Sequence, residues 1–127
     1  MAQRERVSLD LITIGRSGVD LYGQQTGGRL EDMGSFAKYV GGSPTNTAIG
    51  GARLGLKTGL ITRVGGDHMG RFIREELVRD GVDVRGVKTD RERLTALVIL
   101  GIRDRDTFPL IFYRENCADM ALDESDI

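Results

Sequence analysis

The chain has 127 residues, of which 39% are hydrophobic and 29% charged, and its 18 basic and 19 acidic residues give a net charge of −1. This composition indicates one globular domain, excludes a wholly disordered chain, and offers no excess of positive charge for binding nucleic acid. The longest aliphatic run, at 96–100, is far shorter than the roughly 20 residues of a membrane span, so we expect a cytoplasmic protein with no membrane partner.

The first predicted element is a buried strand at 9–15, whose sequence LDLITIG alternates and then closes on glycine. Asp20 follows shortly after this strand. Between 19 and 40, two β-like segments, VDLYGQ and SFAKYV, flank a cluster of glycines and acids. This pattern predicts a hairpin or a small flap.

A helix is predicted to begin after the flap, in the stretch GGSPTN at 41–46. Ser43 is a favourable N-cap, and Pro44 is well tolerated in the first turn because its missing N–H would be unpaired there. The helix is expected to end at Gly55. The two glycines at 50–51 each cost about 1 kcal/mol of helix propensity relative to alanine, so we expect this helix to lie very close to another backbone segment.

A strand at 58–65 and a second helix at 67–80 continue the chain, with Asp67 as the predicted cap of that helix. Its apolar face is formed by Met69, Phe72, Ile73 and Leu77. Two β-runs at 94–102 and 108–114 flank a turn and predict a further hairpin. The alternation of strands and helices predicts an α/β fold, a mainly parallel sheet of two or three core strands flanked by helices. The acidic end DESD has the composition of a polar helix start.

The stretch 41–46 has the chemistry of a binding corner for a polyhydroxy compound. The N–H groups of a helix start are unpaired and favour electron-rich ligands, and Gly41 and Gly42 carry no side chain that would block a ligand. Asn46 offers a donor and acceptors to hydroxyl groups, and the Asp20 carboxylate is able to accept from two hydroxyls at once. The alternatives are an ordinary capped loop at 41–46 and a turn-stabilising role for Asp20.

Two arginines, Arg16 and Arg114, carry planar guanidinium groups that suit a substrate carboxylate, although each taken alone is more often a surface arginine. Cys117 and His68 are the single cysteine and the single histidine, which excludes an intramolecular disulfide and a zinc site of Cys and His ligands. The stretch 41–46 matches neither the Walker A loop nor the dinucleotide fingerprint. We predict no metal site in this chain.

The spacing of residues from 41 to 65 resembles the first signature of the ribokinase-like (pfkB) carbohydrate kinases. A glycine pair is followed by Asn46, Ala48, Gly55 and Gly65. The resemblance covers nearly the whole chain: LDLITIGRSGVDLY resembles the family's first strand and its substrate aspartate, and 95–114 resembles its lid. It implies a partial ribokinase-like fold with a small β lid.

Within this family, GGSPTN, GRSGVDLY and FPLIFYRENCAD resemble most the 5-dehydro-2-deoxygluconokinases of myo-inositol catabolism. Ser43 stands where ribokinases proper carry a lysine, which disfavours a neutral pentose as substrate. The alternatives are a 2-keto-3-deoxygluconate kinase or another sugar kinase of the family, and a non-enzymatic sugar-binding module. A dinucleotide-binding half-domain is a third alternative, but the glycine fingerprint after the first strand is missing.

The resemblance implies ATP-dependent phosphorylation of a sugar acid, with a substrate site formed by Asp20, Gly41, Gly42, Asn46, Arg114 and Arg16. It also implies ATP and Mg²⁺, but the family's Gly-Ala-Gly-Asp element with the catalytic base is not found in these 127 residues. We therefore expect residues 1–127 to be the N-terminal, substrate-side part of a kinase domain, with lid segments at about 19–40 and 94–114. Such a fragment, without the ATP-binding part, would be inactive alone. Its exposed lid strands are compatible with pairing between two subunits, that is, with a homodimer.

Overall fold

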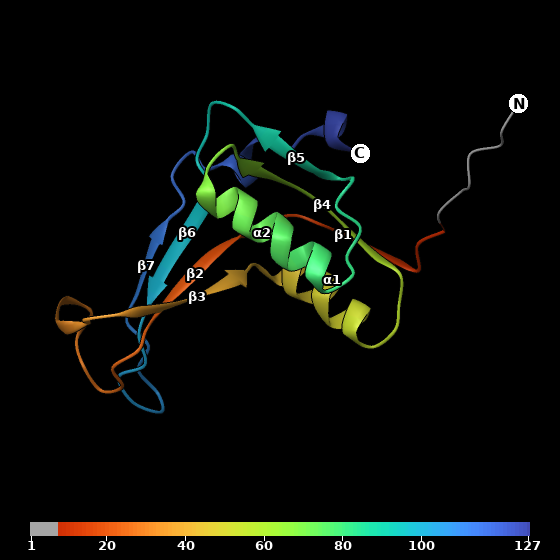
Figure 1. Cartoon of the computed structure of the whole chain (residues 1–127). Coiled ribbons are helices and arrows are strands. Elements are labelled where there is room, and N and C mark those ends of the chain that lie inside the picture. The colour runs from red at the N-terminus through yellow and green to blue at the C-terminus, as the bar shows by residue number, and fades with distance from the viewer. Residues whose placement is uncertain (1–7) are drawn as a thin grey trace, which may run out of the picture.

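The computed structural model describes residues 8–127, so the first seven residues of the expected 1–127 unit lie outside the described part. Two helices and two sheets form the fold (Figure 1). The strands are β1 (Leu11–Ile14), β2 (Gly18–Gly23), β3 (Phe36–Gly41), β4 (Thr58–Gly65), β5 (Val87–Asp90), β6 (Ala96–Leu100) and β7 (Leu110–Tyr113). The helices are α1 (Ser43–Arg53) and α2 (His68–Arg79), and three short 3-10 turns are η1 (Leu30–Asp32), η2 (Ala118–Ala121) and η3 (Glu124–Asp126).

The first sheet is three-stranded and parallel, in the order β1-β4-β5. Its central strand β4 places Leu60 and Val64 in a buried cluster with Ile49 of α1 and with Ile73 and Leu77 of α2. Both helices therefore pack on the same face of β4, as expected where strands alternate with helices. The predicted α/β class with a parallel sheet is confirmed, although the sequence pattern did not predict the edge strand β5.

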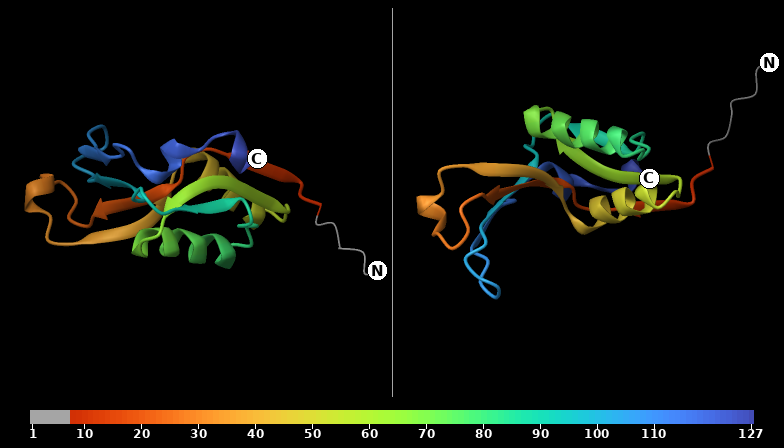
Figure 2. Two further views of the ribbon diagram at one scale, coloured as in Figure 1. Left: turned by 90° about the horizontal axis from the view of Figure 1, so that it is seen from above. Right: turned by 60° about the horizontal axis from the view of Figure 1, so that its bottom comes forward.

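The second sheet has four strands in the order β3-β2-β6-β7, and it is called the lid sheet because it contains both segments that were expected from the sequence to form a lid. Both predicted hairpins are confirmed, since β2 pairs antiparallel with β3 and β6 pairs antiparallel with β7. The parallel pairing of β2 with β6 joins them into one sheet. Figures 1 and 2 show that this sheet extends away from the two helices to one side. Its base is anchored in the core by Val19, which is fully buried.

The start of helix α1 differs from the prediction that Ser43 caps it. Gly42 is the N-cap residue, with a φ of 100°, and Ser43 already belongs to the helix. The first turn is held by residues far away in the sequence: the Thr13 hydroxyl donates to the carbonyl of Pro44 at 2.8 Å, and the Thr45 hydroxyl donates to the carbonyl of Arg16 at 3.1 Å. Tertiary contacts thus hold the start of α1, where no side chain among residues 8–127 caps the helix.

The start of helix α2 agrees with the prediction. The Asp67 carboxylate accepts from the backbone N–H of Gly70 at 2.8 Å, and also from the backbone N–H of Thr95 at 2.9 Å. Burial is the largest single influence and raises the pKa of Asp67, but the hydrogen bonds donated to its carboxylate together stabilise the charged form and hold the pKa below its usual value. One carboxylate therefore joins the start of α2 to the start of the lid strand β6.

The glycine pair of α1 is explained only in part by close packing. A Cβ on Gly51 would lie 2.9 Å from the Cγ2 atom of Thr58, so this position approaches a side chain of β4. Nothing lies within 4 Å of a Cβ added to Gly50. The expectation of a close backbone contact is therefore wrong for Gly50, and at Gly51 the neighbour is a side chain.

Candidate functional site

One face of the lid sheet carries two neighbouring hollows that share Asp20. Side chains alternate between the faces of a sheet, and the register places Asp20 opposite Tyr39 of β3 and Val98 of β6 on the same face. The larger hollow has a volume of about 630 Å³, and its lining includes Asp20, Tyr22, Gln24, Tyr39, Asn46 and Ile102. The smaller hollow, of about 200 Å³, is lined in part by Arg16, Asp20, Gly41, Gly42 and Arg114.

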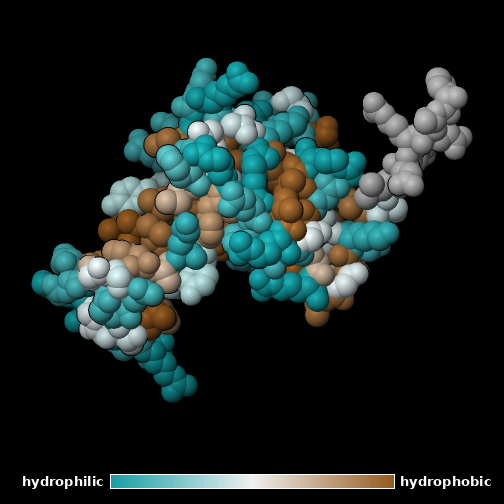
Figure 3. Space-filling model, viewed as in Figure 1, coloured by the Kyte–Doolittle hydropathy of each residue, from teal (hydrophilic) through white to brown (hydrophobic). Residues whose placement is uncertain are grey.

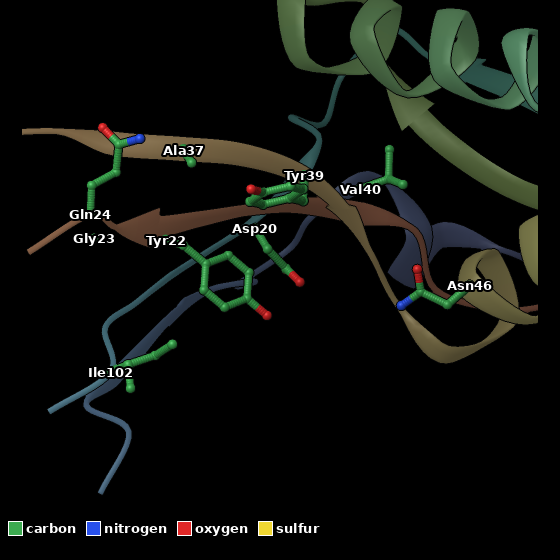
Figure 4. Close-up of a pocket in the computed structure, with 9 residues that line it drawn as sticks. All are labelled: Asp20, Tyr22, Gly23, Gln24, Ala37, Tyr39, Val40, Asn46 and Ile102. Carbon is green, nitrogen blue, oxygen red and sulfur yellow. The ribbon is translucent and has the colours of Figure 1, made fainter. Parts of the chain in front are cut away.

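The other five residues singled out from the sequence thus lie around Asp20. Figure 4 shows the carboxyl of Asp20 and the amide of Asn46 turned toward the same cavity, the first from β2 and the second from the first turn of α1. The acid and the amide come from different elements, and the glycines at 41–42 allow these elements to approach each other at this corner. A carboxylate facing an amide across a cavity offers acceptors and donors to the hydroxyls of one ligand.

The glycine pair makes room for protein groups rather than directly for a ligand. A Cβ on Gly41 would collide with the carboxyl group of Asp20. A Cβ on Gly42 would lie 2.5 Å from the carbonyl oxygen of Arg16, and the φ of 100° at Gly42 is in a region that favours glycine. The pair therefore lets β3 and α1 approach Asp20 and the loop that carries Arg16.

The Asp20 carboxyl has no hydrogen-bond donor from the protein among residues 8–127. Partial burial is the larger influence and raises the pKa of Asp20, while the positive charge of Arg16 acts in the opposite direction. A partly buried carboxylate without a protein partner is costly in an apo protein. Such a group is typical of a site that is completed by a ligand.

Arg114, at the end of β7, is held by an ion pair with Asp119. A terminal nitrogen of its guanidinium donates to Asp119 Oδ1 at 2.8 Å. The Arg114 side chain is 23% exposed, and it lines the smaller hollow together with Arg16. The two arginines therefore put positive charge next to the shared Asp20.

Seven residues that line the larger hollow were missed at the sequence level: Tyr22, Gly23, Gln24, Ala37, Tyr39, Val40 and Ile102. Tyr22 and Tyr39 pack edge to face, with ring centroids 5.5 Å apart. The two-residue period of a strand places Tyr22 on the same face as Asp20, so Tyr22 could have been predicted from the sequence. Tyr39 depends on the register between β2 and β3, and Ile102 depends on the path of the chain after β6; the sequence gives neither.

The remaining candidates for chemistry lie outside this site. Cys117 is buried, and burial raises the pKa of its thiol, so the thiol stays protonated and donates to Asp119 Oδ1 at 3.0 Å. His68 begins helix α2 and lines neither hollow. Within residues 8–127, His, Cys, Asp and Glu side chains form no group of three or more that suits a metal ion. These side chains do not fit Mg²⁺. No helix in the described range is long and apolar enough to cross a membrane.

Comparison with known proteins places the chain in a family. The model of the pfkB family of carbohydrate kinases matches residues 8–127. The chain is 44% identical over 124 residues to a 5-dehydro-2-deoxygluconokinase of Geobacillus thermodenitrificans, a match that covers 97% of this chain and 37% of that relative. This relative carries the name of the subgroup that the sequence motifs indicated.

Solved structures agree with this result. A PfkB protein from Polaromonas sp. JS666 superposes with a TM-score of 0.87 at 35% identity, covering 94% of this chain and 40% of that protein. A putative ribokinase II from E. coli, in complex with ATP and Mg²⁺, gives a TM-score of 0.85 at 26% identity, covering 94% and 38%. Because the family model matches nearly the whole chain and the fold is shared with these kinases, the chain belongs to the pfkB family of carbohydrate kinases.

Proposed function

We propose that this chain is the sugar-binding part of a kinase that phosphorylates a sugar acid, with 5-dehydro-2-deoxy-D-gluconate as the preferred substrate. The observation that carries the proposal is Asp20, a partly buried carboxylate without a protein donor, which faces Asn46 across a cavity next to two arginines. The name of the Geobacillus relative supports this choice of substrate.

Each part of the site has a role toward such a substrate. Asp20 accepts hydrogen bonds from two hydroxyls, and Asn46 donates to and accepts from a further hydroxyl. Arg114 and Arg16 bind the carboxylate, for which a guanidinium is well suited because it donates two parallel hydrogen bonds. The tyrosines of the larger hollow cover the sugar and exclude water. ATP, when bound, supplies the phosphoryl group; the residues described here bind and orient the acceptor.

We propose further that residues 1–127 form the substrate-side unit of the kinase and transfer no phosphoryl group alone. The match to 37% of a curated relative supports this division. The lid segments of the unit are the β2-β3 and β6-β7 hairpins. ATP and Mg²⁺ are then held by residues outside this unit.

A coupled assay of ADP release tests the function in the whole kinase. We expect the highest kcat/KM with 5-dehydro-2-deoxygluconate, a lower value with 2-keto-3-deoxygluconate, and the lowest with fructose. Arg114→Ala is expected to raise KM for both acids more than for fructose. Preference of the wild-type enzyme for fructose, or an equal loss for acids and fructose in the variant, would contradict a sugar-acid kinase.

The edge strand β7 is the basis for a proposed homodimer. All four of its residues are exposed, Phe112 at 59% and Tyr113 at 53%. In Figure 3, hydrophobic side chains gather over the lid sheet beside α2. An exposed apolar edge strand tends to pair with another strand, so a second copy of this chain is the proposed partner. Sedimentation equilibrium over a range of concentrations measures this association.

A further inference from the structure

Asp119 is a buried carboxylate that collects donors from three separate positions. It lies in the turn η2 and is 6% exposed. Its Oδ1 atom accepts from the guanidinium of Arg114 at 2.8 Å and from the thiol of Cys117 at 3.0 Å. Its Oδ2 atom accepts from the backbone N–H of Ser17 at 3.0 Å. One carboxylate therefore ties the end of β7 to the loop before β2.

These two segments carry the two arginines of the smaller hollow. Arg114 contacts Asp119 directly, and Arg16 is the residue before Ser17, so the hydrogen bond to the Ser17 N–H fixes the backbone that carries Arg16. Among residues 8–127, Arg114 donates no other side-chain hydrogen bond. A guanidinium has five N–H donors, so donors remain for a ligand in the hollow that Arg114 lines.

A purely stabilising role does not account well for this arrangement. A buried ion pair contributes little net stability, because removing both charges from water offsets most of their attraction. The ion pair instead fixes the orientation of the guanidinium. An arginine held by an acid on one side presents its remaining N–H donors in a defined direction. The partial exposure of Arg114, against 1% for the Asp119 side chain, shows which partner faces the hollow.

We propose that Asp119 is a positioning residue that sets both arginines for the carboxylate of the substrate. This inference rests on the proposed function, because it needs an acidic substrate. Asp119 itself touches no substrate: it acts through Arg114 on one oxygen and through the Ser17 N–H on the other.

Asp119→Asn in the whole kinase is the main test. An asparagine has a single acceptor oxygen, and the buried Ser17 N–H is unable to turn to water, so that oxygen stays with Ser17. The amide NH₂ then faces Arg114, a donor against a donor, and the arginine turns toward solvent. We expect KM for 5-dehydro-2-deoxygluconate to rise about tenfold, the loss typical of one charged hydrogen bond, while kcat changes less than about twofold.

Two companion variants separate positioning from general disruption. Cys117→Ala removes a donor to the same Oδ1 atom without touching the arginines, and its KM is expected to stay at the wild-type value. In an Arg114→Ala background, adding Asp119→Asn is expected to raise KM for the acid no further, because the residue through which Asp119 mainly acts is gone. If Asp119→Asn does not fold, Asp119→Glu replaces it, since it keeps the charge and displaces it by one methylene.

An acid-specific enzyme whose KM is unchanged in Asp119→Asn, or in Asp119→Glu where the asparagine variant does not fold, would overturn this inference alone. A KM that rises equally in Cys117→Ala would also overturn it, by showing a general effect of the cluster. A wild-type enzyme that phosphorylates only neutral sugars would instead overturn the proposed function, and the positioning role with it.

Discussion

Replacing Gly41 by alanine should weaken sugar binding while leaving the fold nearly unchanged. Gly41 pairs with Gly18 in the lid sheet, and its φ is not in the positive region, so alanine is compatible with the backbone. The added Cβ collides with the carboxyl of Asp20. This group is at the end of a side chain and is able to rotate away, at a cost of about 0.5–1.5 kcal/mol for a displaced rotamer.

The loss in binding follows from what the rotated carboxylate no longer does. A hydrogen bond to a charged group contributes about 1.5–3 kcal/mol, so losing one lowers affinity about 10- to 150-fold. Isothermal titration calorimetry with 5-dehydro-2-deoxygluconate measures this loss in the whole kinase, and a thermal melt reports the fold. The melting temperature is expected to fall by only a few degrees.

Gly50→Ala is the matched control. It adds the same methyl group in helix α1, where nothing lies within 4 Å. Alanine favours a helix over glycine by about 1 kcal/mol, so this variant should melt a few degrees higher and bind sugar as the wild type does. Wild-type sugar affinity in Gly41→Ala would refute this explanation. It would mean that the Asp20 carboxylate binds sugar equally well when a methyl group occupies the space beside Gly41.

Further predictions concern stability, pH and assembly. Asp67→Ala removes the cap of α2 and leaves the buried Thr95 N–H without its acceptor. Urea denaturation should therefore show a free energy of unfolding lower by about 2–4 kcal/mol. Asp67→Asn keeps an acceptor oxygen and should lower the free energy of unfolding by less. Burial raises the pKa of Asp20 above its unfolded value, so above that pKa the charged carboxylate lowers the stability of the folded state. Asp20→Asn should therefore raise the melting temperature at neutral pH, and it should abolish sugar binding. As pH falls through this raised pKa, Asp20 protonates and wild-type sugar affinity should decrease; an affinity that stays flat as the pH is lowered to the point where the protein begins to unfold would contradict this. Phe112→Lys on β7 should shift a concentration-dependent dimer toward monomer in sedimentation, and a monomeric wild type would contradict the proposed partner.

The sequence by itself determined the elements whose signals are local. The apolar period of α2, its cap at Asp67 and the alternation in both hairpins are properties of neighbouring residues, so they are visible without coordinates. The family signature at 41–65 is also visible without coordinates, because its residues lie in one continuous segment of the sequence. Ser43 shows the limit of this approach: it has the chemistry of a cap, but the hydroxyl of Thr13 and the carbonyl of Arg16, both far away in the sequence, hold that helix start instead.

Only the tertiary structure decided how the site is assembled. Asp20 and Arg114 line one hollow because β2 pairs with β6 and β6 with β7, and that register depends on contacts between residues far apart in the chain. The hydrogen bond from Ser17 to Asp119 spans 102 positions and has no local signal. Local propensity depends on adjacent residues, whereas the placement of charges around a cavity depends on which strands pair, and that is a property of the whole fold.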